Sequence, residues 1–255
     1  MNYFNLPFIP ERDKKPRKIG LTMVMDKGLS IREAEDMVSI SGDFVDFVKF
    51  GFGTSVITKS LKEKIAVYRQ ANIRPYLGGT LFEVFIIRGM YNEFRKLIDD
   101  LGLDLVEISD GTMPMAHSDK CKYINEMSKQ VTVISEVGSK LADVEIPNDK
   151  WIAMMKAELD AGSWKVIAEA RESGNIGIYK SDHSANTDLI DGITHNVKND
   201  NVIWEAPIKS QQAWFIKLLG ANVNLGNIAP TEVISLETLR LGLRGDTFFQ
   251  FLPKK

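Results

Sequence analysis

Short apolar runs rich in β-branched residues alternate along the chain with longer segments whose apolar residues recur at helical spacing. The short runs are predicted strands and the longer segments predicted helices. Their mean spacing of about 29 residues is typical of repeated βα units. The eight predicted strands begin near Ile19, Val45, Ile73, Leu103, Val131, Trp164, Asn201 and Ala221.

Polar residues at the ends of the predicted helices support this division. Ser30 followed by Glu33, and Ser60 followed by Glu63, have the spacing of a capping box, in which side chains satisfy the free amides of a first turn. Gly102 and Gly162 stand where two helices are expected to end. We therefore expect helices to begin after Ser30 and Ser60.

The repeated units predict an α/β protein of the (β/α)8 TIM-barrel type, a single domain over residues 1–255 with residues 1–18 as an N-terminal extension. Parallel strands need crossover helices, and eight units of this length close naturally into a barrel. A doubly wound open sheet is the alternative. It lacks its usual glycine-rich dinucleotide fingerprint, because DKGLS follows the first predicted strand.

Composition and charge exclude several classes of partner. The formal net charge is -2, so the chain has no general basic field to hold nucleic acid or an anionic membrane. A lone cysteine, Cys121, cannot form an intrachain disulfide and suits a reducing compartment. The first eighteen residues carry Pro and charge where a signal peptide needs an apolar run. We expect a soluble, cytoplasmic protein without a membrane segment, and a homo-oligomer is compatible with the sequence.

Carboxylates end three successive predicted strands at the edge where a barrel carries its chemistry. Glu107, Glu136 and Glu169 share parity with apolar residues that we expect inside the barrel. Three carboxylates on neighbouring strands could bind one hard divalent ion such as Mg²⁺. The alternative is that some of them form ion pairs with Lys27, Lys49 or Arg171.

Basic side chains follow the strands at the same edge and indicate an anionic substrate. This set is Lys27, Lys49, Lys140, Arg171 and Lys209. The stretch from Lys209 through Ser210 and Gln211 opens a predicted helix, where free amides favour phosphate. The eighth strand adds Asn227. Lys209 could equally be a solvated surface residue.

Ordered blocks across the chain resemble the phosphosulfolactate synthase family, from about Gly20 to Thr247. Two small residues, Ala170 and Gly226, depart from the family's pattern and leave the ionic groups intact. The blocks are DKGL (26–29), DFVKFGFGTS (46–55), GGTLFE (78–83), VEISDGT (106–112), SEVGSK (135–140), EARESG (169–174), EAPIKSQQ (205–212) and VNLGNIAPTEVISLETLRLGLRGDT (223–247).

The resemblance implies a carbon–sulfur lyase that uses Mg²⁺ to add sulfite to phosphoenolpyruvate, giving (2R)-2-phospho-3-sulfolactate. In methane-producing archaea that reaction opens coenzyme M synthesis, a branch of sulfonate metabolism. It further implies Lys140, in the GSK loop, as the general acid, with Lys49 and Lys27 as catalytic cations. Arg171, Lys209, Ser210, Gln211 and Asn227 would bind the substrate, and Glu107, Glu136 and Glu169 the metal.

Two other functions stay open at this point. A Schiff-base aldolase would also use a barrel lysine, with Lys49 or Lys165 as candidates. The family also resembles a plant heat-stress-associated protein, so a non-catalytic barrel protein is the second alternative. Such a protein would not need the complete set of ionic groups that this chain carries.

Overall fold

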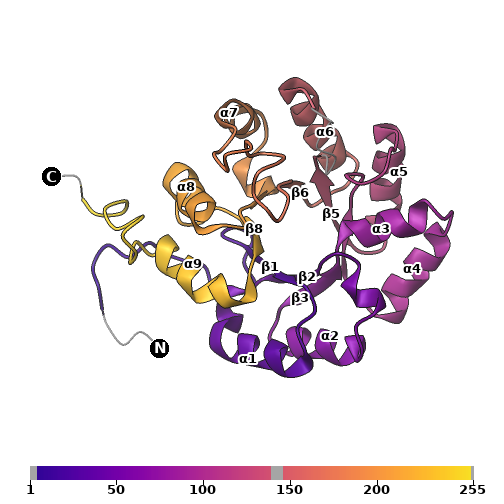
Figure 1. The fold of residues 1–255 in the computed structure, drawn as a ribbon, viewed down its shortest axis with the longest axis horizontal. Helices are drawn as coiled ribbons and strands as arrows, with labels where there is room; N and C mark the ends of the chain where they lie inside the picture. Colours follow the sequence, from indigo (N-terminus) through magenta and orange to yellow (C-terminus); the bar gives the residue numbers. More distant parts are fainter. Residues whose placement is uncertain (1–4, 139–145, 254–255) are drawn as a thin grey trace.

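A computed structural model describes residues 5–138 and 146–253 of the chain. Eight parallel strands curl into one barrel, and helices surround it (Figure 1). The strands are β1 Thr22–Asp26, β2 Phe47–Phe50, β3 Arg74–Leu77, β4 Leu105–Ile108, β5 Thr132–Val137, β6 Lys165–Ala168, β7 Val202–Glu205 and β8 Leu225–Ile228. All eight predicted strands and the TIM-barrel fold are confirmed.

The α-helices follow the strands in the expected alternation, with two of them, α3 and α4, between β3 and β4. They are α1 Ile31–Ser41, α2 Leu61–Gln70, α3 Gly79–Ile86, α4 Tyr91–Asp100, α5 His117–Met127, α6 Asn148–Asp160, α7 Thr187–Asn196, α8 Lys209–Leu219 and α9 Val233–Arg240. Among residues 5–138 and 146–253, no helix is both long and apolar enough to cross a lipid bilayer.

The sheet runs in the order β3-β2-β1-β8-β7-β6-β5-β4, so the barrel closes between β3 and β4. Side chains bridge this seam at both ends. Near the strand starts, Arg74 Nη2 donates to the Asp104 carbonyl at 2.9 Å and to Thr132 Oγ1 at 2.8 Å. At the carboxyl ends, the Gly79 amide donates to Glu107 Oε1 at 2.6 Å. The closure therefore depends on polar side chains as well as on packing.

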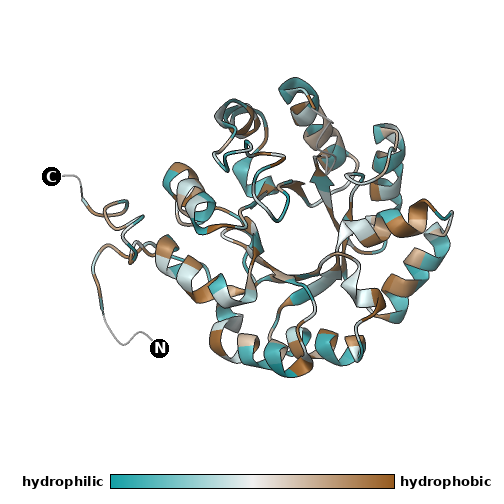
Figure 2. Ribbon diagram, viewed as in Figure 1, coloured by the Kyte–Doolittle hydropathy of each residue, from teal (hydrophilic) through white to brown (hydrophobic). Residues whose placement is uncertain are grey.

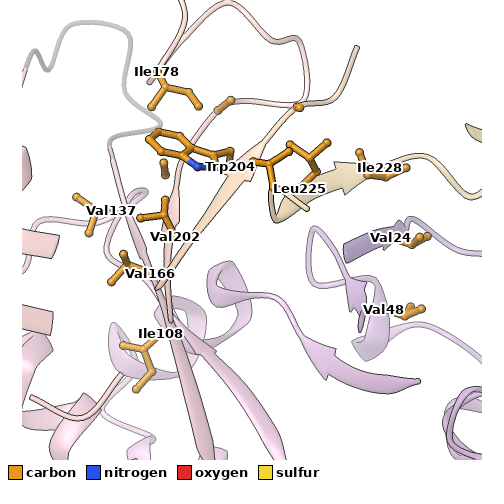
Figure 3. Packing of buried hydrophobic residues seen from close by; sticks show 14 of the residues in the cluster. Val24, Val48, Ile108, Val137, Val166, Ile178, Val202, Trp204, Leu225 and Ile228 are labelled. Carbon is orange, nitrogen blue, oxygen red and sulfur yellow. The ribbon is translucent and has the colours of Figure 1, made fainter. Parts of the chain in front are cut away.

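Alternation along the strands separates two apolar cores. The inward residues fill the barrel, and the outward ones, such as Val48, Val202 and Trp204, pack under the helices (Figure 3). The helices show brown and teal residues side by side, as amphipathic helices do (Figure 2). The barrel interior is filled by Leu21, Met23, Phe47, Tyr76, Leu105, Ile134, Ile167 and Ile203.

One of the two predicted capping boxes is confirmed and the other is wrong. Ser30 Oγ accepts from the Glu33 amide, and the Glu33 carboxylate accepts from the Ser30 amide. Ser60 instead has φ 57°, in the left-handed region, and makes no side-chain cap hydrogen bond. A capping side chain needs an extended backbone at that residue, which Ser60 lacks. Gly102 and Gly162 follow α4 and α6 with positive φ, as predicted for helix ends.

The segment before β1 is attached to the amino-terminal end of the barrel. Arg12 pairs with Glu237 of α9 at 2.9 Å. Lys15 Nζ donates to the carbonyls of Gly42 and Ala71, both at 3.0 Å. The sequence predicts residues 1–18 to be an extension. The structure shows that this segment is held against the barrel from Arg12 onward.

Candidate active site

A cavity of about 440 Å³ opens at the carboxyl ends of the strands. This mouth cavity is where barrel enzymes carry their chemistry, and its volume suits a small molecule. Its wall combines carboxylates, cations and small polar groups with one aromatic ring. The lining residues are Met25, Lys49, Gly51, Phe52, Thr80, Thr112, Glu136, Glu169, Ala170, Arg171, Glu172, Ser173, Glu205 and Asn227.

Lys49 lies at the centre of the carboxylates. It points inward from β2, one pleat above Phe47, and its side chain is 7% exposed. Its Nζ is 3.0 Å from Glu107, 3.1 Å from Glu136 and 3.5 Å from Glu205. Burial opposes the ammonium charge, but these three carboxylates outweigh it and raise the pKa of Lys49 well above its usual value. Lys49 is therefore a permanent cation at neutral pH.

The three glutamates predicted to converge divide into two groups. Glu107 is fully buried, and its Oε1 accepts from the Gly79 amide as well as facing Lys49. Glu136 and Glu169 belong to the cavity wall, from β5 and from the residue after β6. The inward orientation predicted from parity agrees with the contacts of Glu107 and Glu136 with Lys49 and with the place of Glu169 on the cavity wall. The ion-pair alternative also describes the structure, because Lys49 pairs with Glu107 and Glu136.

Glu205 is a fourth carboxylate that the sequence interpretation left out of the site. It ends β7, and its Oε2 accepts from the Ala170 amide at 2.8 Å. Burial raises its pKa to about 8; Lys49 works against the shift and Glu136 adds to it. Strand parity could have identified Glu205 as an inward residue, because it lies two positions after Ile203 of the barrel interior.

The donor chemistry at the cavity wall suits a hard cation. Across residues 5–138 and 146–253, no group of three or more His, Cys, Asp or Glu side chains forms a ready metal site. Mg²⁺ does not need one, since it is commonly held by one or two carboxylates with water and substrate oxygens completing its shell. Glu136 and Glu169 on one wall provide such a pair, so the residues fit Mg²⁺.

Two predicted substrate-binding residues line the mouth cavity. Arg171 follows Glu169 by two residues and contributes a cation to the wall. Asn227, just within the end of β8, has φ 58° and donates from Nδ2 to the Ala170 carbonyl at 3.3 Å. A non-glycine residue at positive φ is uncommon and is often found at functional sites. Arg171 and Asn227 are thus positioned to meet a ligand.

Other predicted residues lie away from the cavity wall. Lys27 pairs with Glu172 at the rim, with its side chain 45% exposed. Lys209 opens α8 but reaches Asp246, 3.1 Å away. Ser210 is exposed beside a separate pocket, and the buried Gln211 donates to the Gly174 carbonyl at 2.7 Å. Lys140 lies outside the described residues.

Outer polar contacts fix the strand ends that carry the glutamates. Lys120 of α5 is fully buried, and its Nζ donates to the Glu136 carbonyl at 2.6 Å. The same ammonium pairs with Asp110 and Glu158, both at 2.8 Å. Lys120 thereby ties the end of β5 to α5 and α6. No local sequence pattern indicates this role, because a lysine on an amphipathic helix normally faces solvent.

Comparison with known proteins identifies relatives over the full fold. Residues 10–246 match the family model described as (2R)-phospho-3-sulfolactate synthase. Phosphosulfolactate synthase from Bacillus subtilis is 42% identical over 98% of this chain and all of its own length. The protein of the same name from Methanothermobacter thermautotrophicus is 43% identical over 97% of this chain and 98% of its own.

More distant relatives match with lower identity. The Arabidopsis thaliana protein HEAT-STRESS-ASSOCIATED 32 is 22% identical over 90% of this chain and 88% of its own length. Among solved structures, 3-hexulose-6-phosphate synthase from Salmonella typhimurium superposes with a TM-score of 0.57 at 13% identity, covering 88% of this chain and all of that one. This structural likeness supports the fold alone.

Replacing Glu205 should change how stability depends on pH. Folded Glu205 keeps its proton up to about pH 8, whereas the unfolded side chain loses it near pH 4.5. The folded state therefore binds more protons, and this carboxyl makes the free energy of unfolding fall as pH rises between those values. In metal-free buffer, Glu205→Gln should show a smaller decline in urea midpoint from pH 5 to pH 8 than wild type. An unchanged decline would contradict the assignment, and the exposed Glu63→Gln is the control.

Removing the Lys120 charge should destabilise the fold. Lys120→Met leaves Asp110 and Glu158 without their cation, which costs about 3–5 kcal/mol for a buried pair. The double variant Lys120→Met/Glu158→Gln removes one of those carboxylate charges and should recover part of the loss. Urea unfolding of both variants measures this. If the single variant were as stable as wild type, the Lys120 network would not be what holds the end of β5 against α5 and α6.

Proposed function

The chain belongs to the phosphosulfolactate synthase family, and on that premise we propose that it uses Mg²⁺ to add sulfite to phosphoenolpyruvate, giving (2R)-2-phospho-3-sulfolactate. The observation that carries the proposal is the composition of the mouth cavity. One wall presents the carboxylates Glu136 and Glu169, while Lys49 and Arg171 supply positive charge. Such a site can bind a cation and two anions together, and both substrates are anions.

The proposed metal site consists of Glu136 and Glu169, with water and substrate oxygens completing the shell. When bound, Mg²⁺ would act as a Lewis acid that stabilises negative charge developing on the substrate carboxylate. The sequence analysis also expects Glu107 to be a metal ligand. Because its Oε1 already accepts from Gly79 and faces Lys49, we assign it the role of positioning Lys49.

In the proposed reaction, the sulfur lone pair of sulfite attacks the methylene carbon of phosphoenolpyruvate and forms the carbon–sulfur bond. The electrons of the carbon–carbon double bond move toward the carboxylate, and the carbon that bears the phosphate ester then takes a proton. Arg171 would hold an anionic group of the substrate. Lys49 would lower the repulsion between sulfite and phosphoenolpyruvate, since it is a buried cation at the cavity wall.

The proton donor is a separate role from the fixed positive charge. The three carboxylates around Lys49 raise its pKa, so it releases a proton poorly at neutral pH. Lys27 does not line the mouth cavity itself, and it is paired with Glu172 of the cavity wall. We therefore keep Lys140 as the proposed general acid, on the basis of the family resemblance.

The Schiff-base alternative receives little support from the two candidate lysines. An aldolase lysine attacks as a neutral amine, whereas the pKa of Lys49 is raised. Lys165 begins β6, four residues before Glu169, which places it about 13 Å below the mouth at the rise of a strand. Burial lowers the pKa of Lys165 to about 8, but its Nζ donates to the Asp200 carbonyl at the opposite end of the barrel from the mouth cavity. As for a non-catalytic role, the chain is far closer in sequence to the synthases than to the plant protein.

Purified protein incubated with phosphoenolpyruvate, sulfite and Mg²⁺ should produce the sulfonate adduct, detected by mass spectrometry. EDTA should abolish turnover and added Mg²⁺ should restore it. Glu136→Gln should weaken Mg²⁺ binding, measured by calorimetry, because the change keeps side-chain volume and removes charge. Full activity of the metal-free enzyme would contradict the metal site. No adduct under any metal condition would contradict the proposed reaction.

Binding of the anionic substrate should depend on Arg171 rather than on Lys209. Arg171→Gln should raise KM for phosphoenolpyruvate about tenfold or more, the size expected for losing a hydrogen bond to a charged group. Lys209→Gln is the matched control, since Lys209 is directed to Asp246 and should leave KM nearly unchanged. Steady-state kinetics on both variants would decide. The reverse pattern would move the anion site to the start of α8.

A further inference from the structure

A second cavity, of about 570 Å³, lies at the amino-terminal end of the barrel. Its wall is built from residues just before β2, β3, β4 and β6 together with Lys15–Lys18 of the leading segment. The packed barrel interior, including Phe47 and Tyr76, separates this basal cavity from the mouth. The basal cavity is therefore independent of the site described above.

The basal cavity is basic, although the whole chain carries a net charge of -2. Two carboxylates face its cations, and both already have partners. Asp46 is 3.3 Å from Arg17 Nε and accepts from the Thr22 amide, and Asp104 accepts from Arg74 at 3.0 Å. The cationic residues are Lys15, Arg17, Lys18, Arg69 and Arg74. Five cations against two carboxylates leave an excess of three positive charges.

Lys15 is a half-buried cation of the basal cavity. Its Nζ donates to two backbone carbonyls rather than to a carboxylate. Burial lowers the pKa of Lys15, the carboxylates of Asp46 and Asp43 oppose that shift, and Arg17 adds to it. Because burial is what works most strongly against this ammonium, an approaching anion stabilises its charged form. Lys18 and Arg69 are exposed residues of the cavity wall, and Arg69 Nη2 donates to the Gly102 carbonyl.

The floor of the basal cavity is apolar. Phe47 and Trp164 meet edge to face with ring centroids 5.9 Å apart, and Ile73 is buried beside them. A low-dielectric floor strengthens the attraction between the cations and a bound anion. The Trp164 ring already has Lys165 Nζ 4.7 Å and Arg74 Cζ 6.0 Å from its centroid. That arrangement leaves little room for a stacked nucleobase and favours a compact ligand.

We propose that the basal cavity binds a small organic polyanion, one that carries a carboxylate together with a phosphate or sulfonate group. Three surplus cations around a cavity of this size match two or three negative charges on one small molecule. The cavity volume falls in the range of small-molecule sites. The proposal does not depend on the reaction proposed for the mouth.

Calorimetry of the metal-free protein at low ionic strength tests the proposal, with 2-phosphoglycolate and sulfoacetate as probes. At least one probe should bind with a Kd below about 1 mM, corresponding to about -4 kcal/mol. Binding should weaken as salt is added. Comparing the probes distinguishes phosphate from sulfonate as the preferred group. A Kd above 10 mM for both would overturn the proposal.

Variants locate the binding. Lys18→Gln/Arg69→Gln should raise Kd at least tenfold, whereas Lys129→Gln/Lys217→Gln, which removes two exposed charges elsewhere, should change it less than threefold. Arg171→Gln, at the mouth, should also leave Kd unchanged. Equal losses in both double variants, or a loss only in Arg171→Gln, would overturn the basal site.

An optical signal provides a second measurement that does not require a folded charge variant. Trp164 lines the basal cavity, so the probe should change its fluorescence. The change should disappear in Trp164→Phe and persist in Trp214→Phe. Persistence of the full change in Trp164→Phe would place the probe elsewhere and overturn the proposal.

Discussion

The ammonium of Lys49 holds together the carboxyl ends of four strands. Glu107, Glu136 and Glu205 surround it, so residues of β2, β4, β5 and β7 share one buried charge cluster. Without the cation these carboxylates would repel one another in a low-dielectric interior. The cluster still carries more negative than positive charge. Burial is the main reason that one of its members, Glu205, has a raised pKa, and the neighbouring Glu136 and Glu107 add to the effect.

The neighbouring backbone gives each glutamate a different role. The Gly79 amide fixes Glu107 across the β3–β4 seam, and the Ala170 amide fixes Glu205 beside the end of β6. Glu136 and Glu169 remain at the cavity wall, and Lys120 holds the backbone of Glu136 from the helical side. A site for a cation and two anions thus follows from how the barrel closes. The same segments that close the barrel also orient its polar groups.

The sequence was sufficient for the fold and for part of the site. Apolar runs at regular spacing located all eight strands, and strand parity placed Glu107, Glu136 and Glu169 inward. Parity describes which face a residue occupies but not the direction of a long side chain. It could not show that Lys209 turns to Asp246.

Local sequence patterns could not predict the backbone conformation of loops or the contacts between residues far apart in the chain. Ser60 had the right neighbours for a cap but lies at positive φ, which the spacing of Ser60 and Glu63 does not reveal. Lys120 resembled a surface lysine, and only the meeting of α5 with α6 and β5 showed that it is buried. These residues depend on tertiary contacts far apart in the sequence.

The protonation of Lys49 is the central claim about the mouth, and NMR of protein with ¹⁵N-labelled lysine side chains tests it directly. The Lys49 signal is assigned by its loss in Lys49→Met. At pH 10, where exposed lysines with a pKa near 10.4 are about 28% neutral, Lys49 should retain the chemical shifts of a full ammonium. Titration of Lys49 together with the exposed lysines, or below them, would contradict the account.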